Sequence, residues 1–203
     1  MQDLAPELIT ERFTLRPLRE SDASDIQKAC QDPEIVRWCV SVPQNYTYQD
    51  ALEYIFFTHI AAERGSEWVW AIDRSGIFCG IISLFDLTGA TANIGFWMTP
   101  NARRQGLLLE AARVVLGFSF DPLGLGLDSI TWTAIDGNIA SEAVAQKLGF
   151  SHIRSVPGGT RGRPDDQGNP TALDARVATM TRQEFAFLGM NQKINPIHPL
   201  PRP

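Results

Sequence analysis

Apolar residues recur at two different spacings along the chain, and each spacing predicts a different kind of element. Where they alternate with polar residues or form a short run we expect a strand, and where they recur every three or four residues we expect a helix. The predicted strands are residues 13–18, 68–73, 78–85, 92–98, 129–134, 150–155 and 174–180. The predicted helices are residues 23–31, 47–64, 106–120, 138–149 and a last one that opens at Thr181.

Residues that favour helix ends support these boundaries. Two pairs have the spacing of a capping box, Thr47 with Asp50 and Thr181 with Glu184. Asn138 is a good N-cap, and Gly149 is typical of a helix C-terminus. Pro33 is expected to end or interrupt the helix that starts near residue 23.

The order of these elements predicts the fold class. Three consecutive strands joined by turn residues indicate an antiparallel meander, and two later strand–helix–strand units imply parallel pairing, because parallel neighbours need a crossover. We therefore expect an α/β (α+β) fold whose mixed sheet is antiparallel in its N-terminal half and partly parallel in its C-terminal half, with helices flanking it. Residues 156–172 are dense in Gly, Pro and Asp, so we expect a long functional loop there.

Length and composition describe one ordinary globular domain. The 203 residues are 44% hydrophobic and 20% charged, and they carry a formal net charge of −5, which gives no attraction to nucleic acid or to an anionic membrane. We expect a single domain over residues 1–188 and a proline-rich tail over residues 189–203. Three scattered cysteines, no metal-ligand spacing, no signal peptide and no membrane-spanning run predict a cytoplasmic protein without a metal.

The turn before the helix at residue 106 is the best candidate for chemistry. A predicted strand ends at Met98, and Arg103 and Arg104 precede Gly106 at the start of the helix. The first turn of a helix offers unpaired N–H groups and a partial positive charge to phosphate, and arginines add charged hydrogen bonds. A phosphorylated ligand is one interpretation, and a solvated turn is the other.

A family resemblance favours a phosphorylated ligand over a solvated turn. The run IGFWMTPNARRQGLLLEAA, residues 94–112, is similar to the coenzyme-A-binding segment of GNAT acetyltransferases, in the branch that includes the ribosomal-protein N-terminal acetyltransferases. Further segments resemble the same family in the same order, residues 11–23, 80–84, 138–150 and 174–185. The resemblance implies acetyl-CoA or another acyl-CoA as cosubstrate.

The resemblance also implies roles for particular residues. The backbone that would pair with the pantetheine arm belongs to Phe96, Trp97 and Met98. The amides that would surround the pyrophosphate belong to Arg104, Gln105, Gly106, Leu107 and Leu108, with Arg103 beside them. Asn138 would contact the pantetheine and Ser141 would protonate the leaving thiolate, although a plain helix cap and an ordinary first-turn residue are the alternatives.

The chain departs from the family pattern at the phosphate turn, and this leaves the donor open. Arg104 stands where the family usually has Gly, and Leu108 stands where it has Gly or Ala. A larger acyl thioester or an aminoacyl-tRNA is therefore an alternative donor, although the acidic composition argues against tRNA. A non-catalytic binding module with this fold is the other alternative.

The expected reaction is direct attack of a primary amine on the thioester, because no Cys–His pair suggests a covalent intermediate. Asp86 and Glu67 are candidates to take the amine proton, and His59 and His152 are weaker ones. A small amine or a peptide N-terminus is the expected acceptor, and relatives of this kind are often homodimers. Three segments are expected to set acceptor specificity, the Phe56–Phe57 helix, the Trp68–Trp70 strand and residues 158–172.

Overall fold

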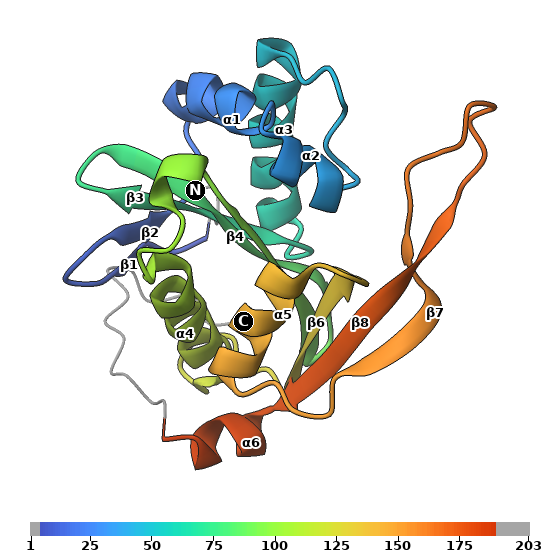
Figure 1. The fold of residues 1–203 in the computed structure, drawn as a ribbon. Helices are drawn as coiled ribbons and strands as arrows, with labels where there is room; N and C mark the ends of the chain where they lie inside the picture. The colour runs from blue at the N-terminus through green and yellow to red at the C-terminus, as the bar shows by residue number, and fades with distance from the viewer. Residues whose placement is uncertain (1–4, 190–203) are drawn as a thin grey trace.

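An eight-stranded sheet runs through the molecule with helices on both of its faces (Figure 1). The structure is a computed structural model, and it describes residues 5–189. The predicted tail, residues 190–203, lies outside the described residues. The strands are β1 (Leu8–Ile9), β2 (Thr14–Arg16), β3 (Trp68–Arg74), β4 (Ile77–Thr88), β5 (Thr91–Met98), β6 (Ser129–Ile135), β7 (Arg154–Arg161) and β8 (Ala172–Thr181).

The helices begin where the sequence supplies capping groups. They are α1 (Ala23–Ala29), α2 (Pro33–Trp38), α3 (Tyr48–Glu63), α4 (Leu107–Phe120), α5 (Ile139–Leu148) and α6 (Arg182–Phe187), with 3₁₀ turns η1 (Glu20–Asp22) and η2 (Pro100–Ala102). Both predicted capping boxes form, at Thr47 before α3 and at Thr181 before α6. Gly149 ends α5 with a left-handed backbone, φ 90°, as its residue type favours.

The mixed sheet that the element order predicts is confirmed, with one parallel pair. The strands lie in the order β1-β2-β3-β4-β5-β6-β8-β7. Within residues 5–189 the one parallel pair is β5 with β6, and α4 makes the crossover between them. The second strand–helix–strand unit brings no parallel neighbour, because β8 inserts between β6 and β7 and pairs antiparallel with both.

Two segments correct the sequence interpretation. Residues 156–172 form a loop only in part: β7 runs as far as Arg161 and β8 starts at Ala172, so residues 162–171 connect the two strands at the end of an arm that extends from the body of the molecule (Figure 1). The strand expected at 150–155 begins at Arg154 instead. Pro33 does not interrupt a helix but starts α2, where Asp32 is the N-cap and accepts a hydrogen bond from the Ile35 N–H at 3.1 Å.

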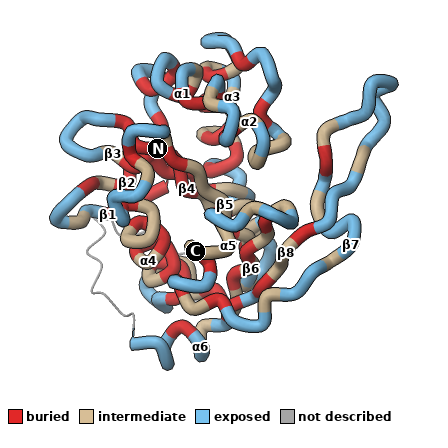
Figure 2. Tube along the Cα trace, in the orientation of Figure 1, coloured by how far each residue is buried: buried red, intermediate tan, exposed pale blue. Residues whose placement is uncertain are grey.

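Alternate residues of each central strand point to opposite faces of the sheet and pack into two hydrophobic cores, one on each face. Along β3, Trp70 and Ile72 join the core with α4 and α5, whereas Val69 and Ala71 join the core with α1, α2 and α3. Figure 2 shows buried segments along these strands, while the end of the β7–β8 arm is exposed. No helix within residues 5–189 has the length and apolar character to span a bilayer.

The expectation that Trp68 and Trp70 contact an acceptor is wrong. Trp68 is 8% exposed and Trp70 is fully buried, and both rings pack against Phe118 of α4. The indole N–H of Trp70 donates to the Pro6 carbonyl oxygen at 2.8 Å. Both indoles therefore belong to the core and leave the exposed Phe56 and Phe57 as the aromatic groups of that region that face solvent.

Candidate functional site

The parallel strands β5 and β6 separate half-way along their length, and this opening is the centre of the candidate site. Their pairing runs from Thr91 opposite Ser129 to Ile94 opposite Trp132 and then stops. On its other edge β5 stays paired with β4 as far as Met98. The backbone of residues 95–98 therefore has no strand partner on the β6 side within the described part of the chain.

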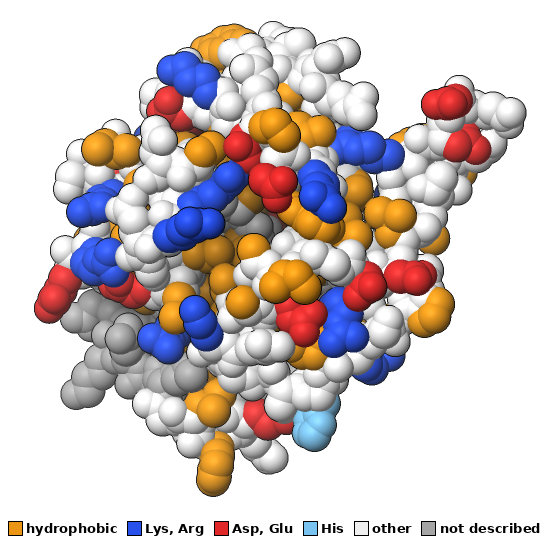
Figure 3. All heavy atoms as spheres, in the orientation of Figure 1, with side chains coloured by type: hydrophobic (Ala, Val, Ile, Leu, Met, Phe, Trp, Pro, Cys, Tyr) orange, Lys and Arg blue, Asp and Glu red, His pale blue; other side chains and the backbone are white. Residues whose placement is uncertain are grey.

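A cavity of about 860 Å³ occupies this opening. It is lined by residues of β5 and β6, of the turn and first residues of α4, of α5 and of α2. The predicted cofactor residues among them are Phe96, Trp97, Met98, Arg103, Arg104, Gly106, Leu107, Leu108 and Asn138, and Ser141 joins them. Figure 3 shows hydrophobic side chains in the middle of this face of the molecule, with basic and acidic side chains around them.

The turn before α4 has the backbone conformation that a phosphate-binding turn needs. Gly106 is the N-cap of α4 with φ 77°, and a Cβ there would have nothing nearer than Arg12 Nη1 at 4.0 Å. The approach to the first amides of α4 is therefore open. Arg104, at the position where the resembled family has glycine, also adopts a left-handed backbone, φ 60°, and its side chain is exposed at the cavity.

Arg103 does not direct its guanidinium at this turn. Its Nε donates to the Met98 carbonyl oxygen at 3.2 Å, and its Nη2 donates to Asp32 Oδ1 at 2.5 Å. Burial acts to raise the pKa of the Asp32 carboxyl, but the hydrogen bonds from Arg103 and from the Ile35 N–H outweigh it and lower the pKa. This side chain therefore fixes the turn against α2.

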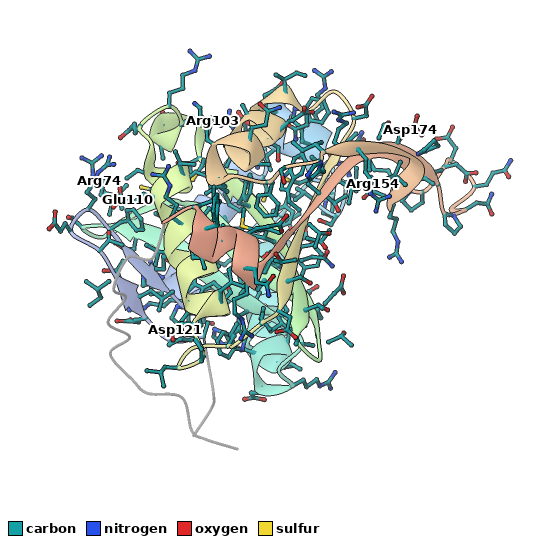
Figure 4. The ribbon with its side chains drawn as sticks, turned by 90° about the horizontal axis from the view of Figure 1, so that it is seen from below. Arg74, Arg103, Glu110, Asp121, Arg154 and Asp174 are labelled. Atoms are coloured by element: carbon teal, nitrogen blue, oxygen red, sulfur yellow. The ribbon has the colours of Figure 1, made fainter. Side chains whose placement is uncertain are left out.

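Gln105 is the one predicted cofactor residue whose position lies outside the cavity lining. Its side chain accepts from Arg74 Nη1 at 2.9 Å and donates to the Asn101 carbonyl oxygen at 2.6 Å. Its own carbonyl oxygen accepts from Arg12, which also pairs with Glu110 at 3.0 Å. Figure 4 shows Arg74 and Glu110 at the same edge of the molecule. These contacts hold the outer side of the turn.

Asn138 and Ser141 meet on the β6 side of the cavity. The Asn138 side-chain oxygen accepts from the Ser141 N–H at 3.1 Å, so Asn138 is a genuine helix cap as well as a lining residue. The Ser141 hydroxyl oxygen accepts from the indole N–H of Trp132 at 3.1 Å. This bond uses a lone pair of the hydroxyl and leaves its proton available to a partner in the cavity.

Asp86 lies outside the cavity lining. It sits at an irregularity of β4 with a left-handed backbone, φ 51°, and its carboxylate accepts from Asn93 Nδ2 at 3.0 Å. Glu67 precedes β3, which pairs with this end of β4. Burial, and then the nearby charge of Asp86, raise the pKa of the Glu67 carboxyl. His59 has a structural partner, since its Nε2 lies 2.9 Å from the Leu18 carbonyl oxygen.

Sequence reasoning missed the α2 side of the cavity. The lining residues there are Glu34, Ile35, Trp38, Cys39 and Val40. The Asp32–Pro33 pair could have predicted this helix, because a capping residue followed by proline at the first helical position is a common start. Within residues 5–189, no three His, Cys, Asp or Glu side chains gather as a metal site would require.

Comparisons with known proteins agree with this geometry. The family model described as an acetyltransferase (GNAT) domain matches residues 12–151. YdaF of Bacillus subtilis (strain 168), which carries the name of a ribosomal N-acetyltransferase, is 34% identical over 77 residues. That match spans 37% of this chain and 41% of YdaF, which is less than half of its length.

Two solved structures share the fold. RimJ of Mycobacterium smegmatis, in complex with a CoA disulfide, superposes with a TM-score of 0.73 at 18% identity, covering 92% of this chain and 94% of RimJ. The microcin C7 self-immunity acetyltransferase MccE, in complex with acetyl-CoA and AMP, has a TM-score of 0.73 at 16% identity, covering 88% of this chain and 98% of that one. With the family model matched over residues 12–151, the chain belongs to the GNAT acetyltransferase family.

Proposed function

We propose that this protein transfers an acyl group, with acetyl the simplest case, from coenzyme A to a primary amine by direct attack within a ternary complex. The observation that carries the proposal is the separation of β5 from β6. It leaves the backbone of residues 95–98 unpaired along a cavity that leads to the open N-terminus of α4. An extended ligand with a phosphate at one end fits an unpaired strand edge followed by a helix N-terminus.

Coenzyme A would be held mainly by backbone groups. Phe96, Trp97 and Met98 would pair with the pantetheine arm, and the amides from Arg104 to Leu108 would receive the pyrophosphate. When bound, the cofactor supplies the thioester. Because Arg103 is engaged with Asp32 and Met98, its part is to fix the turn rather than to contact phosphate. Arg104 keeps the left-handed conformation of the turn, so its departure from glycine is compatible with an acyl-CoA donor.

Ser141 is the residue that we propose to protonate the leaving thiolate. Its hydroxyl lines the cavity and is oriented by Trp132, whose N–H donates to the oxygen and strengthens the hydroxyl as a donor. Asn138 fixes the first turn of α5 through the Ser141 N–H and so positions this hydroxyl. Asn138 lines the same cavity, and its side-chain amide would contact the pantetheine.

The proton of the attacking amine would leave toward the carboxylates Glu67 and Asp86, directly or through water. We propose Glu67 as the base, because its pKa is raised toward neutrality, where a general base accepts a proton more readily. The residue before Asp86 lies close to the cavity wall, since a Cβ on the lining residue Gly95 would lie 3.1 Å from Cε1 of Phe85. Asp86 would raise the proton affinity of Glu67 by its charge.

The acceptor that we propose is a peptide or protein N-terminus. The support is the name of YdaF as a ribosomal N-acetyltransferase, together with the RimJ fold match. A free small amine is the alternative. Acceptor profiling with a panel of short peptides and polyamines would separate them, because each acetylated product has its own mass.

The first experiment is thermal unfolding with and without excess acetyl-CoA. A ligand at about 100 times its Kd stabilises the folded state by about 2.7 kcal/mol, which raises Tm by several degrees. S-Acetylpantetheine, which carries the same thioester but lacks the pyrophosphate and the adenosine, is the matched control and should stabilise less. If acetyl-CoA, malonyl-CoA and long-chain acyl-CoA all leave Tm unchanged, the proposed donor is wrong.

A further inference from the structure

Helix α2 lines part of the cavity and contacts residues on both the β5 and the β6 side of the opening. It lies between α3 and the β7–β8 arm (Figure 1) and contributes Glu34, Ile35 and Trp38 to the cavity lining. Ile35 is its one buried residue, and it packs in the core on the α1 and α3 face of the sheet. A six-residue helix with a single buried side chain has little apolar anchoring. Polar contacts at its two ends therefore fix the position of this helix.

The N-terminal end of α2 is fixed to the β5 side of the opening. The N-cap Asp32 accepts from Arg103 Nη2 at 2.5 Å, and these side chains are 16% and 32% exposed. Arg103 in turn donates to the carbonyl oxygen of Met98, the last residue of β5. This end of the helix is thus bound to the turn that leads into α4.

The C-terminal end of α2 is fixed to the β7–β8 arm by Arg163. Its guanidinium donates to the carbonyl oxygens of Val36 at 2.5 Å and Val42 at 2.6 Å, with that of Cys39 at 3.4 Å. The last carbonyls of a helix lack partners within the helix and carry a partial negative charge, which a guanidinium satisfies well. Thr171, across the arm, donates its hydroxyl to the Arg163 carbonyl oxygen and holds this residue in place.

A third contact joins α2 to the β6 side. The Trp38 ring reaches the turn between β6 and α5, where a Cβ on Gly137 would lie 3.9 Å from its Cη2. Arg37 stacks over the Trp38 ring at 4.5 Å, and Glu34 accepts from the indole N–H at 3.1 Å. Because Gly137 directly precedes Asn138, Trp38 lies across the cavity next to the proposed catalytic helix.

We infer that α2 is a clasp that closes the cavity over the bound thioester, and that Arg163 is the positioning residue that keeps it closed. The inference rests on the proposed acyl transfer, since it assigns to α2 the exclusion of water from that reaction. The same cavity reaches from Ile94 and Trp132, where β5 and β6 part, to Trp38 and Cys39. A closed clasp keeps water from the thioester, and its opening admits the amine.

The test compares Arg163→Ala and Arg163→Lys with Arg154→Ala, a matched control in β7 whose side chain is exposed. Hydrogen exchange of the backbone amides of residues 33–42 reports the clasp directly and requires no ligand. Loss of charged hydrogen bonds to the end of α2 should speed this exchange by roughly tenfold or more in Arg163→Ala. Arg163→Lys should recover part of the protection, because one ammonium can reach fewer carbonyl oxygens than a guanidinium.

The second readout is hydrolysis of acetyl-CoA without any acceptor. Arg163→Ala should raise the hydrolytic kcat several-fold while KM for acetyl-CoA stays within about twofold, since Arg163 is not among the residues that line the cavity. Arg154→Ala should match the parent protein in both assays.

The outcomes separate the clasp from the reaction. Unchanged exchange of residues 33–42 in Arg163→Ala would overturn the clasp, whether or not the protein binds acetyl-CoA. Faster exchange with unchanged hydrolysis, or with a parallel rise in KM, would overturn its role in excluding water. Failure of the parent protein to bind any acyl-CoA, with exchange still faster in Arg163→Ala, would overturn the proposed function and leave a clasp over another ligand.

Discussion

Arg104 stands where the resembled family usually has glycine, and its backbone conformation explains why glycine is favoured at this position. Its φ of 60° lies in the left-handed region, which costs a residue with a Cβ about 1 kcal/mol or more. The position therefore requires a left-handed backbone conformation rather than the small volume of glycine. The sequence indicated the departure but not its consequence, because φ cannot be read from residue type alone.

Replacement of Arg104 by glycine should stabilise the protein by up to about 1 kcal/mol, since it removes this strain and glycine's extra unfolded-state entropy offsets only part of the gain. Urea denaturation measures the change. Arg161→Gly, in strand β7, is the control and should be destabilising by about 0.5–1 kcal/mol. Equal effects of the two substitutions would show that strain at Arg104 is absent.

Glu67 offers a prediction that depends on pH. Its pKa is raised in the folded protein, by burial and then by Asp86, so the folded state favours the protonated carboxyl. Stability from this group is thus complete below the unfolded-state pKa and declines as pH rises through the folded-state pKa. Glu67→Gln should raise Tm at pH 8 and leave it nearly unchanged at pH 4. An equal shift at both values would assign the effect to something other than titration.

At the level of elements, local capping signals predicted α3, α5 and α6 well, whereas contacts between distant residues decided the rest. Thr47 with Asp50 needs only neighbours in sequence, and both hydrogen bonds of that box form. The Arg103 contact with Asp32 and the Arg163 contacts with α2 join residues far apart in sequence. No local sequence pattern predicts such long-range contacts. The glycines and prolines of 156–172 also suggested a loop, although cross-strand pairing with β8 extends β7 to Arg161.

The first turn of α5 and its N-cap hold two predicted site residues, Ser141 for the leaving thiolate and Asn138 for the pantetheine, and their roles can be separated by substitution. Ser141→Ala should lower kcat by about 10² or more, the usual contribution of a positioned proton donor, while acetyl-CoA still raises Tm as in the parent. Asn138→Ala should cost about 1 kcal/mol of stability, as the loss of an N-cap does. Steady-state kinetics and urea denaturation measure the two effects. A Ser141→Ala variant with parental kcat would remove Ser141 from the mechanism.

On the scale of the whole molecule, a buried ionic cluster connects β2 to β3 and to the turn that leads into α1. Arg16 of β2 donates to both carboxylate oxygens of Asp22 at 2.8 Å and to Asp73 of β3 at 2.7 Å. Arg16 and Asp22 are only 6% and 4% exposed. Its hydrogen bond with Asp22 is the chief reason that the pKa of the Arg16 guanidinium is raised. The cluster thus orders the start of α1, beside which α3 packs.

Asp22→Ala should destabilise the protein by about 3–5 kcal/mol, because it leaves the buried guanidinium with one of its two carboxylate partners and also frees the Arg19 N–H that donates to Asp22 at 2.8 Å. Asp25→Ala is the matched control three residues along, where the carboxylate is 52% exposed and its ion pair with Lys28 spans 3.8 Å. That pair contributes at most about 0.5 kcal/mol. Chemical denaturation of both variants measures the difference. Similar small losses would mean that water replaces Asp22 around Arg16 and that packing of α1 against α3, not the ionic cluster, holds this part of the molecule together.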